Sequence, residues 1–207
     1  MKSMNAKARI IKRQGNDVQV SRYVLGSLVT IETKALIGRM NKTVTNMKQL
    51  ESYKEGIFLP DVDVDSGDFV YNVSQNENYV VSAVYPEPFK NKTISLVTNL
   101  LKCNHLLTVK TLKKVADTRG NTKTELVVSY NGVPCFVEEV TNELRQIDAG
   151  IHPDTEYRIY TSALDIKETD QASIQIRGVE ERFKVIARNY VTFPKMLVME
   201  VSRDVRA

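Results

Sequence analysis

Four aspartates lie close together in residues 59–68, which read LPDVDVDSGD. They are Asp61, Asp63, Asp65 and Asp68. Closely spaced carboxylates are ligands that Ca²⁺ prefers, so these four residues are the candidate ligands if a cation binds. A helix-loop-helix calcium loop also needs Gly at its sixth position and Glu at its twelfth. Counted from Asp61, those positions hold Ser66 and Asn72. We therefore favour a structural role for the aspartates, and we expect no metal and no cofactor.

The other residues that could do chemistry do not form a catalytic pattern. Cys103 and His105 are spaced as a C-x-H pair, but no second pair lies at zinc spacing, and His152 is the other histidine. The sequence has no Gly-rich phosphate loop and no nucleophile elbow. Neighbouring carboxylates such as Glu138 and Glu139 would point to opposite faces of a strand. We expect that the protein is not an enzyme, and a calcium-dependent or other hydrolytic enzyme ranks last among the alternatives.

Composition and charge indicate an ordinary folded protein. The 207 residues are 42% hydrophobic and 26% charged, which suits one large domain or two small ones. The net charge of +4 is too small to indicate a dedicated nucleic-acid binder. Basic residues do concentrate in residues 7–13 and 109–115, although such runs are most often solvated faces or strand edges. The candidate DNA-facing residues are Lys7, Arg9, Lys12 and Arg13.

The sequence gives no reason to expect a membrane protein. No stretch approaches the roughly 18 apolar residues that span a bilayer, and the N-terminus lacks the pattern of a signal peptide. Cys103 and Cys135 stand alone, which suits free thiols in a reducing compartment. We therefore expect synthesis in a cytoplasm.

Strand signals dominate the chain. Short segments rich in Val, Ile, Thr, Tyr and Phe are bounded by Gly, Pro, Asn or Asp, as in a sandwich or barrel. The dipeptide Asn131-Gly132 predicts a two-residue hairpin turn. In residues 59–68, Val62 and Val64 alternate with aspartates, which predicts a strand with one acidic face. The predicted fold is mainly β.

One segment has the spacing of a helix. Leu36, Met40, Val44 and Met47 recur every three or four residues, and Gly56 follows. This pattern predicts a helix or long loop near residues 34–53. A shorter helix is possible in residues 137–148.

An internal repeat indicates two copies of one unit. The matched pairs are Asp63 with Asp165, Asp68 with Asp170, Tyr79 with Phe183, Val81 with Val185, Phe89 with Phe193, and the segments around Gly15 and Gly120. We predict two similar small β-barrel or sandwich units in tandem, residues 1–104 and 105–207, with the helix or long loop inserted in the first.

Residues 163–190, ALDIKETDQASIQIRGVEERFKVIARNY, resemble the closing half of the tailed-phage head-tail joining proteins, the stopper or head-completion family of the phage neck. The resemblance rests on Asp165, Asp170, Gly178 and Phe183, and residues 111–129 resemble that family's opening hairpin. The chain is about twice the expected length, so its first half would be a diverged second copy. Other phage tail terminators or baseplate β modules share the pattern.

The resemblance implies a virion structural protein of the head-tail connector, neck or tail. Copies would form a homo-oligomeric ring around the DNA channel, between the portal or adaptor side and the tail side, with non-specific proximity to DNA. The protein would be found in the virion, and in the host cytoplasm during assembly. The candidate partner-interface residues are Leu36, Met40, Val44, Met47, Ile57, Phe58 and Leu59, unless they cover their own barrel. The alternative function is a small nucleic-acid-binding β-barrel protein.

Overall fold

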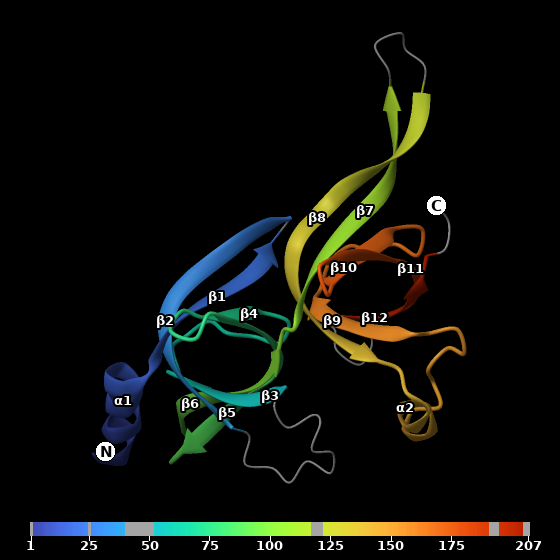
Figure 1. The fold of residues 1–207 in the computed structure, drawn as a ribbon. Helices are drawn as coiled ribbons and strands as arrows, with labels where there is room; N and C mark the ends of the chain where they lie inside the picture. The colour runs from blue at the N-terminus through green and yellow to red at the C-terminus, as the bar shows by residue number, and fades with distance from the viewer. Residues whose placement is uncertain (1, 25, 40–51, 117–121, 191–194, 205–207) are drawn as a thin grey trace. The chain divides into compact units, whose positions relative to one another are not determined.

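The computed structural model describes residues 2–24, 26–39, 52–116, 122–190 and 195–204 (Figure 1). The chain forms two compact units. The first is Met1–Cys103 with Phe193–Met196, and the second is Asn104–Thr192 with Leu197–Ala207. Both units are antiparallel β structures, so the predicted mainly-β tandem fold is confirmed.

The first unit is a closed six-strand barrel preceded by a helix. Its elements are α1 (Lys2–Gln14), β1 (Asn16–Val24), β2 (Ser27–Arg39), β3 (Tyr53–Phe58), β4 (Phe69–Asn72), β5 (Glu77–Phe89) and β6 (Lys92–Lys102). The strand order around the barrel is β1-β2-β3-β6-β5-β4. Pairing of β1 with β4 closes the barrel, so its sheet has no open edge.

The second unit repeats this topology. Its elements are β7 (His105–Ala116), β8 (Thr122–Glu139), α2 (Asn142–Ile147), β9 (Tyr157–Ser162), β10 (Gln171–Ile176), β11 (Val179–Asn189) and β12 (Met196–Arg203). Read from β7, the order is β7-β8-β9-β12-β11-β10, which is the order of the first barrel strand for strand.

The equivalent cores support the same correspondence. Tyr79 and Phe183 are both fully buried, at the matched position of β5 and β11. The register of β5 shifts just after Val81, and that of β11 shifts just after Val185. A β-bulge is a specific local feature, so its occurrence at the same point in both barrels is strong evidence for one repeated unit.

The predicted helix near residues 34–53 is wrong where the structure describes it. Residues 34–39 belong to β2, and Tyr53 begins β3. Ala35 pairs with Phe58, and both are fully buried inside the barrel. Inward alternation and pairing on both sides of β2 outweigh the helical spacing. Residues 40–51, with Met40, Val44 and Met47, lie outside the described part of the chain.

Residues 2–14 form a helix, and the basic run of residues 7–13 lies on this helix and not on a strand edge. Lys, Ala, Arg and Gln favour a helix, and the fully buried Ile11 anchors α1, which contacts β2 and β6. The N–H of Gly15 donates to the carbonyl of Ile11 at 2.9 Å, where a Cβ would lie 2.4 Å from that oxygen. Gly15 thus ends a helix, whereas Gly120, which the repeat matched with it, lies outside the described part of the chain.

The predicted turn at Asn131-Gly132 is also wrong. Strand β8 continues through the dipeptide, and its register against β7 shifts between Leu107 and Lys110. Gly132 has a φ of +68°, which a bulge can require as well as a turn.

The shorter predicted helix is present as α2, where the Thr141 hydroxyl accepts from the Leu144 N–H at 3.2 Å. Neither of the described helices is long and apolar enough to cross a membrane.

Candidate interaction surfaces

The aspartate segment forms turns instead of the predicted strand. The Asp68 Oδ2 accepts from the Asp65 N–H at 2.8 Å, and the Asp170 Oδ2 accepts from the Lys167 N–H at 2.8 Å. Asp68 and Asp170 are each 3% exposed. Asp68 and Asp170 are therefore turn residues, and the valines of residues 59–68 point inward without forming a strand.

Asp68 also has a partner from β1. Its carboxylate accepts from Arg22 Nε at 3.0 Å and from Arg22 Nη2 at 2.8 Å, and the same guanidinium reaches Asp63 Oδ1 at 3.1 Å. Burial raises the pKa of Asp68 despite the favourable guanidinium, while the Asp68 hydrogen bond raises the pKa of Arg22. This ion pair fastens the aspartate turn to the barrel.

The geometry does not favour a calcium site. Among the described residues, no group of three or more His, Cys, Asp and Glu side chains could hold a metal. Asp63 binds Arg22, Asp65 accepts from the Ser66 N–H at 2.8 Å, and Asp61 is exposed. The carboxylates serve separate contacts instead of converging on one point.

The surroundings of the C-x-H pair, Cys103 and His105, also do not indicate a metal site. His105 Nδ1 lies 2.9 Å from Asn104 Oδ1, and burial lowers the pKa of His105. Cys135 lies on β8 directly opposite His105 and is fully buried, and burial raises its pKa to about 12. A thiol of this kind is inert at neutral pH.

The predicted partner-interface residues that the structure describes lie on different faces of the barrel wall, and one of them points into the barrel. Leu36 and Ile57 are directly opposite each other on β2 and β3, and both are half-buried. Phe58 is fully buried, so its assignment to a partner interface is wrong, because adjacent strand residues point to opposite faces. Leu59 is half-buried at the wall of a cavity.

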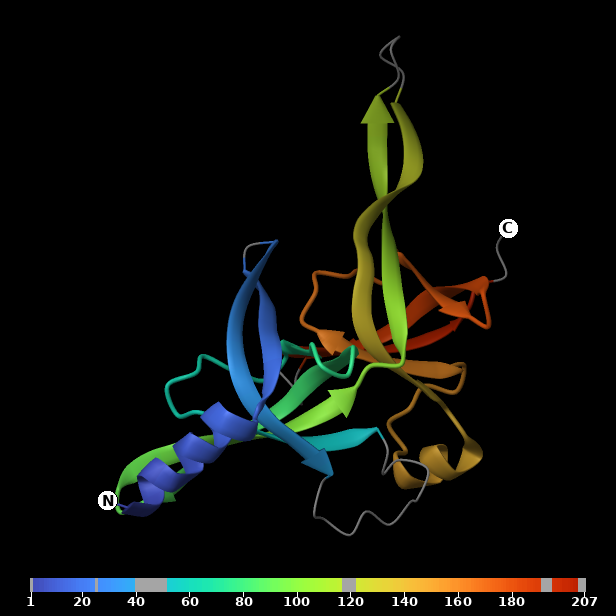
Figure 2. The ribbon, with the colours of Figure 1, turned by 60° about the vertical axis from the view of Figure 1, so that its left-hand side comes forward.

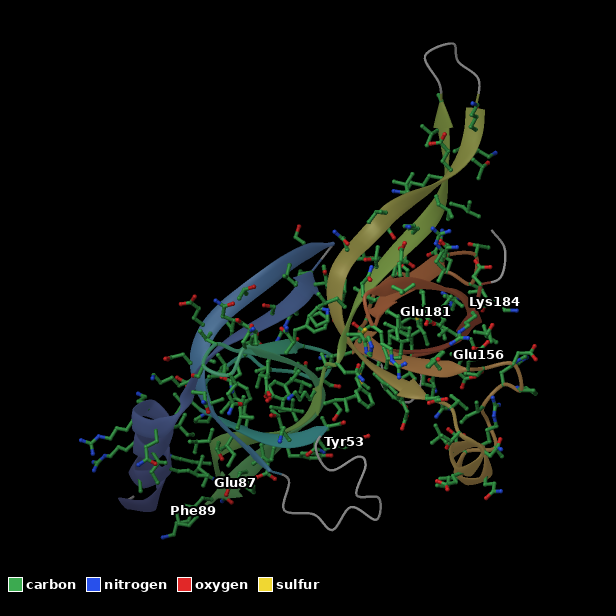
Figure 3. All side chains as sticks on the ribbon, viewed as in Figure 1. Tyr53, Glu87, Phe89, Glu156, Glu181 and Lys184 are labelled. Carbon is green, nitrogen blue, oxygen red and sulfur yellow. The ribbon has the colours of Figure 1, made fainter. Side chains whose placement is uncertain are left out.

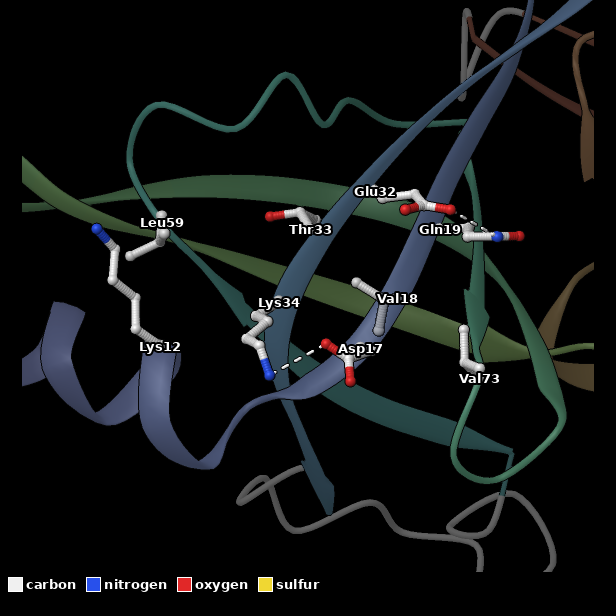
Figure 4. Close-up of a pocket in the computed structure, with 9 residues that line it drawn as sticks. All are labelled: Lys12, Asp17, Val18, Gln19, Glu32, Thr33, Lys34, Leu59 and Val73. Carbon is white, nitrogen blue, oxygen red and sulfur yellow. Dashed lines mark hydrogen bonds and ion pairs between the residues drawn. The ribbon is translucent and has the colours of Figure 1, made fainter.

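This cavity lies on the first unit and has a volume of about 510 Å³ (Figure 4). It is lined by Lys12, Asp17, Val18, Gln19, Glu32, Thr33, Lys34, Leu59 and Val73. Lys34 Nζ lies 3.0 Å from Asp17 Oδ1, and Gln19 Nε2 donates to Glu32 Oε1 at 3.3 Å. Because its polar groups pair with one another, the cavity defines no ligand class.

The four candidate DNA-facing residues all lie on α1. Lys7 pairs with Glu87, which Figure 3 shows at the end of the barrel nearest the helix, and this contact lowers the pKa of Glu87. Arg9, Lys12 and Arg13 are exposed, and their spacing of three and four residues places them on one side of α1. Lys7 therefore fixes the helix to its barrel, while the other three form a small basic surface.

A surface that we did not predict is the ribbon formed by β7 and β8 beyond their barrel (Figures 1 and 2). Strand β10 pairs with β7 as far as Lys110, and β9 pairs with β8 from Phe136 onward. In the described part beyond those points, β7 and β8 pair with each other up to Ala116 and Thr122. The exposed large apolar residues of this ribbon are Leu112, Val115, Leu126 and Val128. The signal available in the sequence was the lysine pair Lys113-Lys114 between Leu112 and Val115.

These features define a tandem double-barrel β protein with a protruding ribbon. No protein family model matches the sequence, and no curated protein matches it. Among solved structures, the chain is similar to one described as "Structure of K. pneumonia MrkH-c-di-GMP complex", with 7% sequence identity, 100% coverage of this chain, 87% coverage of that chain and a TM-score of 0.17. A likeness at this score carries no argument about function.

Proposed function

We propose that the chain is a bacteriophage virion structural protein of the head-tail connector or neck that assembles in a ring around the DNA channel. One observation carries the proposal, namely that both barrels contain the same aspartate turn and the same aromatic-centred, bulged strand. These are elements on which the resemblance to the head-tail joining proteins rests. Their presence in the first barrel supports extending that resemblance to the diverged half of the chain.

The exposed apolar residues also support a role in assembly. Val24, Leu28 and Val29 lie near the β1–β2 turn, and their exposed fractions are 44%, 54% and 49%. Together with the equivalent ribbon of β7 and β8, they give each barrel a protruding apolar surface. Such surfaces suit contacts with protein partners. Contacts between unlike surfaces of identical subunits close into a ring when the rotation permits.

The partners in this account are other virion proteins, on the portal or adaptor side and on the tail side. The protein would act in the virion and pass through the host cytoplasm during assembly. DNA would pass through the ring without sequence-specific contacts. A tail-terminator or baseplate position would use the same ring geometry, so the genes that adjoin this one distinguish the positions.

A second candidate function is non-specific nucleic-acid binding by a small β-barrel protein. The observation that favours it is the exposed basic surface of Arg9, Lys12 and Arg13. Contacts of this kind act on phosphates, so the affinity for DNA would fall steeply with salt.

Co-expression with the products of adjoining genes tests the proposed function. Complexes captured on a tagged copy of this chain are sized by light scattering, and binding to duplex DNA is measured across a salt series. Head-tail function predicts a complex with several copies of this chain and a portal or tail protein. A monomer that ignores those proteins and binds DNA with steep salt dependence would contradict it.

A further inference from the structure

We propose that copies of this chain bind head to tail, with the β7–β8 ribbon of one copy contacting the acidic turn of the next. The acidic turn is residues 59–65, and the ribbon face is Leu112, Lys114, Leu126 and Val128. The inference rests on the proposed ring assembly and names the contact that would build it.

The ribbon face follows from the pairing of β7 and β8. Leu112 lies directly opposite Leu126, Lys110 opposite Val128, and Lys114 opposite Thr124. Directly opposite residues share a face of an antiparallel pair, so Leu112 and Leu126 lie between Lys110 and Lys114, and Val128 lies beside Lys110. Lys110 also pairs with Glu180 at 3.4 Å. Leu112, Leu126 and Val128 are 48%, 44% and 51% exposed within the single chain. A two-stranded ribbon is marginally stable alone, so covering this face would stabilise it.

The charge of the ribbon indicates what covers it. Lys114 is exposed on the ribbon face, whereas the exposed Lys113 and Lys123 lie on the opposite face, where Glu125 is opposite Lys113. Two ribbons packed face to face would place like charges together, which disfavours a symmetric contact. The complementary surface should be acidic, with apolar side chains between its carboxylates.

The acidic turn has these properties. Asp61 is exposed, and the side chain of Asp63 is 79% exposed although it contacts Arg22. Leu59 and Val62 are half-buried beside them. The carboxylate of Asp65 pairs with Lys195. The turn therefore presents the carboxylates of Asp61 and Asp63 next to partly accessible apolar carbon, which matches Lys114 and the leucines of the ribbon face.

The two barrels differ in the charge of their equivalent turns and ribbons. The second barrel carries Ala163 and Lys167 where the first has Asp61 and Asp65. The β1–β2 turn region, residues 21–30, contains no lysine, and its one arginine, Arg22, binds Asp68. Each chain thus has one basic apolar ribbon and one acidic turn, which is the arrangement that a head-to-tail contact requires.

DNA is the competing partner for the ribbon because its lysines would attract phosphates. The apolar residues between Lys110 and Lys114 favour a protein surface over a phosphate backbone. The experiment below separates these two partners.

The test uses full-length variants on the two faces of the ribbon. Lys114→Glu and Leu126→Ser change the ribbon face, while Lys123→Glu and Val115→Ser are matched changes on the opposite face. Asp61→Lys changes the acidic turn. Self-association is measured by analytical ultracentrifugation, alone and with the co-expressed neighbouring proteins, and duplex DNA binding is measured in parallel.

We expect Lys114→Glu, Leu126→Ser and Asp61→Lys each to weaken association between copies by roughly tenfold, with little effect from the two opposite-face variants. Combining Lys114→Glu with Asp61→Lys should restore association. If copies of every variant associate like the natural chain, the contact is overturned while ring assembly stands. If Lys114→Glu lowers only DNA affinity, the ribbon faces DNA and the contact is also overturned. If the natural chain stays monomeric even with its neighbours, ring assembly and this contact both fail.

Discussion

Arg22 and Asp68 form a bidentate ion pair in the first barrel that has no equivalent among the described residues of the second. The two carboxylate oxygens of Asp68 accept from one guanidinium at 3.0 and 2.8 Å. The equivalent Asp170 is buried to the same extent, but its Oδ1 has no hydrogen-bond partner among the described residues. Phe69, which follows Asp68, pairs with Ser21, and Gln171, which follows Asp170, pairs with Lys110. The residue after Lys110 is Thr111, which therefore occupies the position of Arg22 in the second barrel. Within the described residues, the turn is therefore held by an ion pair in the first barrel and not in the second.

Replacing Arg22 with Ala should destabilise the first barrel by about 2–3 kcal/mol, because it leaves the Asp68 carboxylate buried without its cation. Urea denaturation measures the loss. Hydrogen exchange should become faster in residues 59–72 and stay unchanged in residues 163–176.

The matched control is Arg9→Ala on the exposed side of α1, which should change stability by less than about 0.5 kcal/mol. Equal effects of the two substitutions would show that the ion pair does not hold the turn.

Glu77 should contribute to the acid sensitivity of the first barrel. It accepts from Lys102 and from the buried phenol of Tyr79, and the Lys102 hydrogen bond is the main cause of its lowered pKa. A carboxyl with a lowered pKa adds stability above its ordinary value of 4.5, and this stability is lost as the pH falls through the folded value.

Glu77→Gln should therefore cost about 1 kcal/mol at pH 7, and the difference from the natural chain should shrink below about pH 4. Urea midpoints between pH 3 and pH 7 measure this. Glu143→Gln, on the exposed surface of α2, serves as the control. A difference that is independent of pH would contradict the assignment.

The glycine in the β8 bulge should resist substitution because of its backbone conformation. Gly132 has a φ of +68°, and a Cβ there would meet nothing within 4 Å. Gly132→Ala should cost about 1–2 kcal/mol through strain alone.

Gly38→Ala is the control for the backbone angle φ. A Cβ at Gly38 would also meet nothing within 4 Å, but Gly38 does not have a positive φ. It should be neutral or stabilise by up to about 1 kcal/mol. Thermal melting of both variants gives the comparison, and equal Tm values would contradict the role of the bulge.

The two thiols should differ in reactivity. Cys103 is half-buried, while Cys135 is fully buried with its pKa raised to about 12. Titration with a thiol reagent at pH 8 should label Cys103 first, and Cys135 should react only after denaturation. Rapid labelling of Cys135 in the native protein would show that the second barrel opens readily.

The sequence predicted the repeated turn because its signal is local. Asp68 and Asp170 bond backbone N–H groups within their own turns, so residue type and spacing reveal them. The same repeat matched Tyr79 with Phe183, and both are fully buried. Arg22 was not recognised as the partner of Asp68, because that contact joins residues 46 positions apart and depends on the barrel register.

The errors came from patterns that fit two structures. Leu36 fits a helical spacing but lies on a strand paired on both sides, and the buried Ile11 belongs to a helix despite its β-branched side chain. Asn131-Gly132 suits a hairpin turn but lies in a bulge. In each case pairing or packing with distant segments decided the outcome, and a local pattern contains no information about those segments.

The most direct test of the proposed function is the mass of the complex formed when the chain is co-expressed with the products of its adjoining genes. Light scattering on the purified complex should give a ring-sized assembly with several copies of this chain and a portal or tail protein. The chain recovered as a monomer in the presence of every adjoining gene product would contradict the account.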